Sequence, residues 1–247
     1  MKRKEFRIKE TMATIIADEN FIPVAEAEII RQRKFLENYI KEFPLFRTTL
    51  EPCPVAPDAA EIVRRMAEAS AKFRVGPMAA VAGAIAEFAL RAMVRAGAAQ
   101  AIVDNGGDIA MALSRPVTVG IFSGPAKIKN IGLKFQPRPG IIGVCTSSGT
   151  IGHSLSFGQA DAATVISPNV CLADAAATAL GNAIKDKNPA LIEDAMKALL
   201  LEGIEGMLVI IDDVMSICGD LPQIVKVRMD IDKISRGKGA EARRNRT

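Results

Sequence analysis

The chain contains 247 residues, of which 49% are hydrophobic and 24% are charged, so it can bury a sizeable core and is not a disordered segment. Aromatic residues make up 4% and tryptophan is absent, which argues against a nucleic-acid surface built on stacked aromatic side chains. The net charge of +4 is concentrated in residues 233–247, where six cations stand against one glutamate. We therefore expect one domain over residues 1–232 and a basic, flexible tail over 233–247, with a nucleic-acid or anionic-membrane arm as the alternative use of that tail.

The cysteines indicate the compartment. Cys53, Cys145, Cys171 and Cys218 form no C-x-x-C pair, and no signal peptide precedes them. This pattern predicts reduced thiols in a cytoplasmic protein, without a disulfide framework or a zinc site. The longest weakly polar stretch, residues 77–86, is too short to span a bilayer, so no membrane association is expected.

The first half of the chain is predicted to begin with a β-hairpin, in which polar and apolar residues alternate through 5–9 and 14–16. A long amphipathic helix over 25–41 follows Pro23 and is capped at Pro44, and a proline-rich connector covers 51–57. Asp58 is the expected N-cap of a helix over 59–72, and another helix is expected over 78–95.

The second half is predicted to alternate short strands with two helices. The strands are expected at 101–103, 109–113, 117–121, 131–135, 141–145, 163–167, 207–211 and 224–229, and the helices at 171–184 and 189–201. This order predicts an α+β fold in which helices pack on a largely antiparallel sheet.

Small residues form one face of the helix expected over 78–95, namely Ala79, Ala82, Gly83 and Ala86. Such a face allows a flat ligand, another helix or a second subunit to approach closely. We therefore hold Gly83 as a candidate ligand-binding residue, with tight helix packing as the alternative, and expect a homodimer.

The segment Asp104-Asn105-Gly106-Gly107-Asp108 lies between two expected strands. The two glycines permit positive φ and could present backbone amides to a phosphate, while Asp104 and Asp108 could bind hydroxyl groups. The alternative is an ordinary hairpin turn, because Asn-Gly is typical of two-residue β-turns.

A second segment, Thr146-Ser147-Ser148-Gly149, follows the strand at 141–145 and could hold an anion, with a positive φ expected at Gly149. The chain's one histidine, His153, stands beside it and could act as acid, base or ligand. Cys145 and His153 could also form a thiolate pair, and an ordinary loop is the remaining alternative.

A carboxylate and a hydroxyl are expected on one face of the helix over 171–184, because Asp174 and Thr178 are four residues apart. A lone carboxylate in an apolar helix is costly unless it is paired or binds a metal, and Mg²⁺ prefers such oxygen ligands. Alternatively, Asp174 caps the helix and Thr178 bonds its own backbone.

The segments V-D-N-G-G-D-I, C-T-S-S-G and A-D-A-A-A-T-A-L, in this order, resemble the ApbE-like superfamily, whose best-known members are Mg²⁺-dependent FAD:protein FMN transferases. The likeness covers residues 76–184, where V-A-G-A-I-A-E is similar to the G-G-I-A-K-G helix of that family. The compact spacing resembles an archaeal and bacterial branch rather than the transferases proper. Glu87 replaces the family's lysine, and His153 is only a loose counterpart of its H-I-I-D-P histidine.

The resemblance implies an ApbE-like α+β fold, FAD or a related nucleotide as ligand, Mg²⁺, and a possible protein acceptor. It implies metal ligands at Asp174 and Thr178, a flavin-nucleotide loop at Asn105, Gly106, Gly107 and Asp108, and a phosphate-side loop at Thr146, Ser147, Ser148 and Gly149. The first hypothesis is an enzyme that transfers or hydrolyses at the FAD pyrophosphate, with His153 and Asp174 as catalytic candidates. The second is a non-catalytic flavin- or nucleotide-binding accessory protein in sulfur or cofactor metabolism.

Overall fold

The structure is a computed structural model that describes residues 1–149 and 158–228. Two of the predictions, the role of His153 and the basic tail over 233–247, lie outside the described residues.

Two antiparallel sheets form the body of the molecule. The large sheet has eight strands in the spatial order β1 (Lys2–Ile8), β2 (Thr11–Ala17), β3 (Ala101–Asn105), β4 (Asp108–Leu113), β7 (Arg138–Ser147), β8 (Ala162–Ser167), β9 (Gly206–Ile211) and β10 (Val214–Gly219). The small sheet has the order β11 (Gln223–Lys226), β6 (Ile131–Phe135) and β5 (Val117–Ile121). Each pairing within both sheets is antiparallel, so the predicted sheet type is confirmed.

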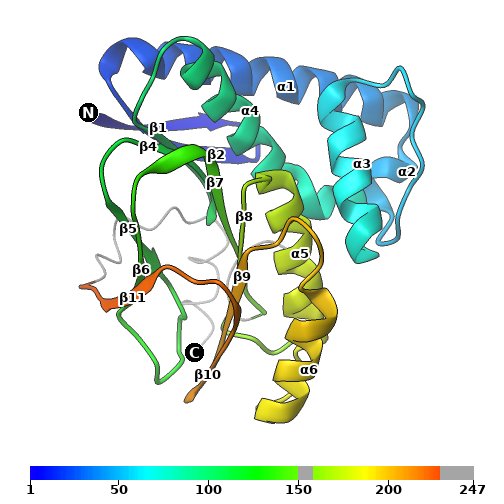
Figure 1. The fold of residues 1–247 in the computed structure, drawn as a ribbon. Helices are drawn as coiled ribbons and strands as arrows, with labels where there is room; N and C mark the ends of the chain where they lie inside the picture. Colours follow the sequence, from blue (N-terminus) through cyan, green and yellow to red (C-terminus); the bar gives the residue numbers. More distant parts are fainter. Residues whose placement is uncertain (150–157, 229–247) are drawn as a thin grey trace, which may run out of the picture.

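The helices and the small sheet lie on opposite faces of the large sheet (Figure 1). The helices are α1 (Ile22–Glu42), α2 (Leu45–Thr48), α3 (Glu61–Phe73), α4 (Val81–Arg95), α5 (Val170–Ala183) and α6 (Pro189–Leu199), with 3₁₀ turns at Glu19–Phe21 and Pro77–Ala80. Helices α4 and α5 pack on each other and on the middle strands β3, β4 and β7. The α+β prediction is therefore confirmed.

Strand alternation sorts the apolar residues into two cores. In β9, Met207 and Val209 face the helices, whereas Leu208 and Ile210 face the small sheet. This strand is a continuous apolar run because both of its faces are buried.

Several predicted boundaries were wrong. Helix α3 begins at Glu61 with Ala60 as its N-cap, so Asp58 does not cap it. The C-cap of α1 is Phe43, and Pro44 instead precedes α2, which was not predicted. Strand β10 was also missed, because its Val-Met-Ser-Ile-Cys sequence gives only a weak polar-apolar alternation.

One helical stretch among the described residues, Pro77–Arg95, is long and apolar enough to cross a membrane by length and composition alone. Within the molecule, 67% of the most apolar 18 residues of this stretch is buried. Its helix α4 packs against α1, α5, β3 and β4. Its apolar character is thus accounted for by its place in the core.

Candidate functional site

The β3–β4 hairpin turns at Gly106 and Gly107, whose φ values are +75° and +107°. Asp104 pairs with Ile109 across the hairpin, and the Asp104 Oδ1 accepts a 2.9 Å hydrogen bond from the Gly107 N–H. The hairpin interpretation of this motif is confirmed, since both turn residues need the left-handed conformation that glycine adopts without strain.

The hairpin residues point to different faces of the large sheet. Ile102 packs toward the small sheet and Val103 toward the helices, so alternation places Asp104 on the small-sheet side and Asn105 on the helix side. The Asn105 Nδ2 donates a 3.1 Å hydrogen bond to the Ala82 carbonyl at the start of α4.

Asp108 lies on the helix side, because it alternates with Ala110 of the helix-side core. The structure therefore brings Asn105 and Asp108 together beneath α4 and α5 and turns Asp104 away from them.

Asp174 projects from the interior of α5 rather than from its end. The N-cap of α5 is Asn169, whose side chain accepts a 3.0 Å hydrogen bond from the Leu172 N–H. The Asp174 side chain is buried, and its Oδ2 accepts a 2.8 Å hydrogen bond from the Gly83 N–H on α4. The alternative in which Asp174 merely caps the helix is therefore wrong.

Asp108 and Asp174, which we call the carboxylate pair, form the electrostatic centre of this region. Burial raises the pKa of the Asp108 carboxyl to about 7, and the charge of Asp104 adds to this while a hydrogen bond with Cys145 opposes it. Burial also raises the pKa of Asp174 well above its ordinary value, and the Asp108 charge raises it further. Hydrogen bonds from the backbone amides of Gly83 and Ala82 lower this pKa and so partly oppose the shift. Among the residues described, no lysine or arginine is a leading influence on either pKa.

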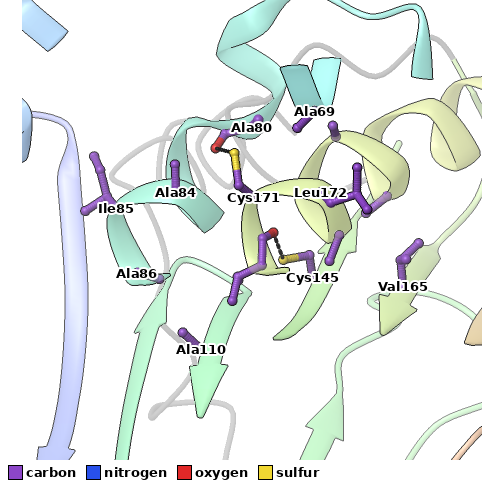
Figure 2. Packing of buried hydrophobic residues seen from close by; sticks show 14 of the residues in the cluster. Ala69, Ala80, Ala84, Ile85, Ala86, Ala110, Cys145, Val165, Cys171 and Leu172 are labelled. Carbon is purple, nitrogen blue, oxygen red and sulfur yellow. Dashed lines mark hydrogen bonds between the residues drawn. The ribbon is translucent and has the colours of Figure 1, made fainter. Parts of the chain in front are cut away.

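Cys145 lies directly opposite Asp108 in the β4–β7 register and is completely buried. Its Sγ donates a 3.5 Å hydrogen bond to the Val170 carbonyl, and Figure 2 shows this thiol packed inside the core with Cys171 nearby. Burial raises the Cys145 pKa well above its ordinary value, and the Asp108 charge adds to the shift. These surroundings disfavour the thiolate, so the predicted thiolate pair is not supported at its cysteine.

The residues of the second motif also divide between the two faces. The hydroxyl groups of Thr146 and Thr164 are 2.9 Å apart on the small-sheet side, whereas Ser147 pairs with Ala163 on the helix side. Ser148 follows the end of β7, and the Gly149 N–H donates to the Ala160 carbonyl at 2.9 Å.

Gly149 does not have the expected positive φ. A side chain there would instead collide with the backbone carbonyl of Gly158. The need for glycine at this position therefore comes from close backbone packing.

The small-residue face of α4 is used for helix packing. A Cβ atom at Gly83 would lie 2.6 Å from the Val170 carbonyl oxygen and 2.7 Å from the Asp174 Cβ. The tight-packing interpretation is thus confirmed at Gly83, and the homodimer stays a prediction.

Glu87 is an important residue that the sequence reasoning did not assign. It is 1% exposed on α4, and its Oε2 accepts hydrogen bonds from the Val170 and Cys171 N–H groups at 2.9 and 3.1 Å. Its Oε1 accepts from the Arg65 Nη2 at 2.6 Å and the Arg91 Nε at 2.9 Å. Glu87 and Asn169 therefore occupy amides at the start of α5 that would otherwise be open to an anion. The four-residue spacing from Glu87 to Arg91 was the one sequence signal for this network.

The donor set of the carboxylate pair fits a hard divalent cation. Mg²⁺ is commonly held by one or two protein carboxylates together with substrate phosphates and water. Asp174 uses one carboxylate oxygen on Gly83 and retains further lone pairs, and half-buried Thr178 is one helical turn away. In residues 1–149 and 158–228, no group of three or more His, Cys, Asp or Glu side chains is arranged to hold a metal. A divalent cation in this region would therefore be coordinated by the two carboxylates and by oxygen atoms of a bound ligand.

The comparisons with known proteins agree with this architecture. The family model described as AbpE bacteria matches residues 2–210. The proteins named UPF0280 protein from Methanocella arvoryzae and Methanothrix thermoacetophila are 50% and 48% identical, over 96% of this chain and 96% and 100% of their own lengths.

Among solved structures, the flavinyl transferase ApbE of Pseudomonas stutzeri matches with a TM-score of 0.55 and 14% identity, over 96% of this chain and 98% of that one. The ApbE protein of Thermotoga maritima matches with a TM-score of 0.57 and 12% identity, over 96% and 100%. At these identities the match concerns the fold, and the ApbE-like fold expected from the motifs is confirmed.

Proposed function

Since this chain belongs to the family described as AbpE bacteria, we propose that it binds FAD or a related nucleotide together with Mg²⁺ at the carboxylate pair, and acts on the pyrophosphate by transfer or hydrolysis. The observation that carries the proposal is the pair formed by buried Asp174 and half-buried Asp108, whose pKa values are both raised and among whose leading influences no lysine or arginine of the described residues appears. Two carboxylates in such surroundings favour a ligand that brings positive charge.

The chain's own groups would bind and orient the nucleotide. Asp108 and Asp174 would hold the cation, with Thr178 as an added oxygen donor. Asn105 is fixed by its bond to Ala82, and Ser147 is the hydroxyl of the second motif that shares the helix side with the carboxylate pair. When bound, Mg²⁺ would supply charge neutralisation on the phosphates, a contribution of several kcal/mol in reactions of this class.

The direct test is incubation of the protein with FAD and Mg²⁺, followed by chromatographic measurement of FMN and AMP. We expect product with the wild-type protein and none with Asp174→Asn. The matched control is Asp58→Asn, because Asp58 is exposed and lies outside α3. Absence of turnover in the wild type would remove the enzymatic form of the proposal.

A second candidate is a nucleotide-binding accessory protein without catalysis, and Glu87 is the observation that favours it. Where the transferases carry a lysine, this chain uses a buried carboxylate to close the start of α5. Equilibrium dialysis against FAD, FMN and adenine nucleotides, with and without Mg²⁺, separates the two candidates. Binding that requires Mg²⁺ and Asp174 but yields no product selects the accessory protein, whereas absence of binding overturns both. The proposal also includes a protein acceptor and a cytoplasmic location.

A further inference from the structure

Helices α4 and α5, which pack side by side (Figure 1), are joined by two carboxylates that each bind the first turn of the other helix. Asp174 on α5 accepts its 2.8 Å hydrogen bond from the Gly83 N–H of α4. In return, Glu87 on α4 accepts hydrogen bonds from the Val170 and Cys171 N–H groups, the first two of α5, at 2.9 and 3.1 Å. On each helix the residues of the two links are three or four positions apart, so the links are separated by about one helical turn.

The apolar side chains of α5 provide little to fix its position along α4. In the middle of α5 the buried apolar residues are alanines, namely Ala173, Ala175, Ala176 and Ala177. Small side chains let two helices approach closely, but they form low ridges that interlock weakly with the grooves of a neighbour. We therefore expect the two polar links to determine where α5 lies along α4.

Glu87 is itself held from two sides. Its Oε1 accepts hydrogen bonds from Arg65 on α3 at 2.6 Å and from Arg91 on α4 at 2.9 Å, and the residue is 1% exposed. Arg65 also donates, at 3.3 Å, to the side chain of Asn169, which caps α5. Close packing and charge-assisted hydrogen bonds therefore fix Glu87 and, through it, the first turn of α5.

We propose that Glu87 is a positioning residue for the cation: by holding the first turn of α5 against α4, it sets where the Asp174 carboxylate lies relative to Asp108. This inference rests on the proposed function, in which the carboxylate pair binds Mg²⁺. Asp108 belongs to β4, on which α4 packs, so the position of α5 along α4 decides the separation of the two carboxylates. Glu87 acts through the α5 backbone, since its charge is not a leading influence on the pKa of Asp174.

The coordination geometry of the cation makes this positioning measurable. Mg²⁺ requires near-ideal octahedral ligands at about 2.0–2.1 Å, whereas Ca²⁺ accepts irregular ligand sets at about 2.3–2.6 Å. A small displacement of Asp174 is therefore expected to weaken Mg²⁺ binding more than Ca²⁺ binding. A general loss of stability lowers the apparent binding of both cations by the same factor, because it removes folded protein.

The test is competition for Mn²⁺, which also binds oxygen ligands, on the full chain. Unbound Mn²⁺ is measured by electron paramagnetic resonance while Mg²⁺ or Ca²⁺ is added. We expect Glu87→Gln to weaken Mg²⁺ binding at least about tenfold, as is typical when a residue that supports a metal ligand is replaced, and to weaken Ca²⁺ binding less.

Val170→Pro is the second variant, because it cuts the link from the α5 side. Proline is favourable at the first position of a helix, and here it removes one N–H donor to Glu87 and leaves the arginine pairs of Glu87 in place. We expect the same shift in favour of Ca²⁺. Should Glu87→Gln fail to fold by circular dichroism, Val170→Pro decides alone.

The control is Leu133→Ala, which destabilises the fold in a core separate from α4 and α5, where Leu133 is fully buried beneath the small sheet. A lower ratio of Mg²⁺ to Ca²⁺ affinity in the variants at Glu87 and Val170, with the wild-type ratio in Leu133→Ala, supports the inference. A wild-type ratio in all three overturns it, and the proposed function stands if Asp174→Asn abolishes Mn²⁺ binding. Absence of Mn²⁺ binding by the wild type, with FAD present or absent, removes the proposed function and this inference together.

Discussion

The Asp174 carboxylate on α5 accepts its 2.8 Å hydrogen bond from the backbone N–H of Gly83 in the first turn of α4. The bond is possible because residue 83 has no side chain, which lets α5 approach the α4 backbone directly. One glycine therefore sets both the distance between two core helices and the position of the central carboxylate.

Gly83→Ala tests this relationship. Helix propensity alone would make the substitution stabilising by about 1 kcal/mol. Because the new Cβ would lie 2.6 Å from the Val170 carbonyl oxygen, we expect a net loss of about 1–3 kcal/mol instead. Urea unfolding gives the free energy, and a variant more stable than the wild type would show that the helices separate without cost.

Glu87→Gln tests the network at the start of α5. The substitution removes the charge that pairs with Arg65 and Arg91 but keeps an acceptor for the Val170 and Cys171 amides. We expect a loss of about 3 kcal/mol in unfolding free energy, the scale for breaking a buried ion pair. Glu19→Gln is the control, because its pair with Lys2 is exposed and is expected to contribute under about 1 kcal/mol. Equal effects of the two substitutions would contradict this account of Glu87.

The raised pKa of Asp108 predicts how stability depends on pH in the absence of divalent cations. In the folded protein this pKa is about 7, against 3.8 for an unperturbed aspartate. The folded state therefore holds the proton more tightly, and stability is lost as pH rises through this interval.

We expect a melting temperature at least about 3 °C higher near pH 5 than near pH 8, a shift equal to about 1 kcal/mol for a chain of this size. Asp108→Asn should flatten the dependence, whereas Asp58→Asn should leave it as in the wild type. A wild-type melting temperature that increases toward pH 8 would refute the burial of an uncompensated Asp108 carboxyl.

The four cysteines are predicted to differ in reactivity. Cys145 and Cys171 are 0% and 1% exposed, and burial raises the pKa of both thiols well above the ordinary value. Cys53 and Cys218 are partly exposed. Mass spectrometry after brief treatment with a maleimide should find Cys53 and Cys218 modified first, with Cys145 and Cys171 modified after unfolding. Rapid modification of Cys145 in the native protein would restore the nucleophile hypothesis.

Neighbouring hydroxyls of the second motif are predicted to have different roles. Ser147→Ala should weaken nucleotide binding by about 0.5–1.5 kcal/mol, the usual contribution of one hydrogen bond, because Ser147 shares the helix side with the carboxylate pair. Thr146→Ala should leave affinity unchanged and reduce stability by about 1–3 kcal/mol, because the buried Thr164 hydroxyl loses its partner. Calorimetric binding and urea unfolding of both variants check this, and equal affinities for the wild type and Ser147→Ala would place the ligand elsewhere.

Local patterns in the sequence determined the secondary structure and part of the candidate site. The alternating N-terminal segment formed β1 and β2, and the Gly106-Gly107 turn formed the β3–β4 hairpin. The four-residue spacing of Asp174 and Thr178 was informative because both belong to one helix. Such features depend on residues close together in the chain, where backbone geometry alone fixes which side chains share a face.

Tertiary structure decided which of these residues meet and what surrounds them. Asp104 and Asp108 look equivalent in sequence, yet the hairpin places them on opposite faces of the large sheet. Glu87 looks like a surface residue at helical spacing from Arg91, but Arg65 and the start of α5 enclose it. These outcomes depend on strand register and helix contacts between segments far apart in the chain, and the burial that shifts the pKa of Asp108 and Asp174 arises only when those segments assemble.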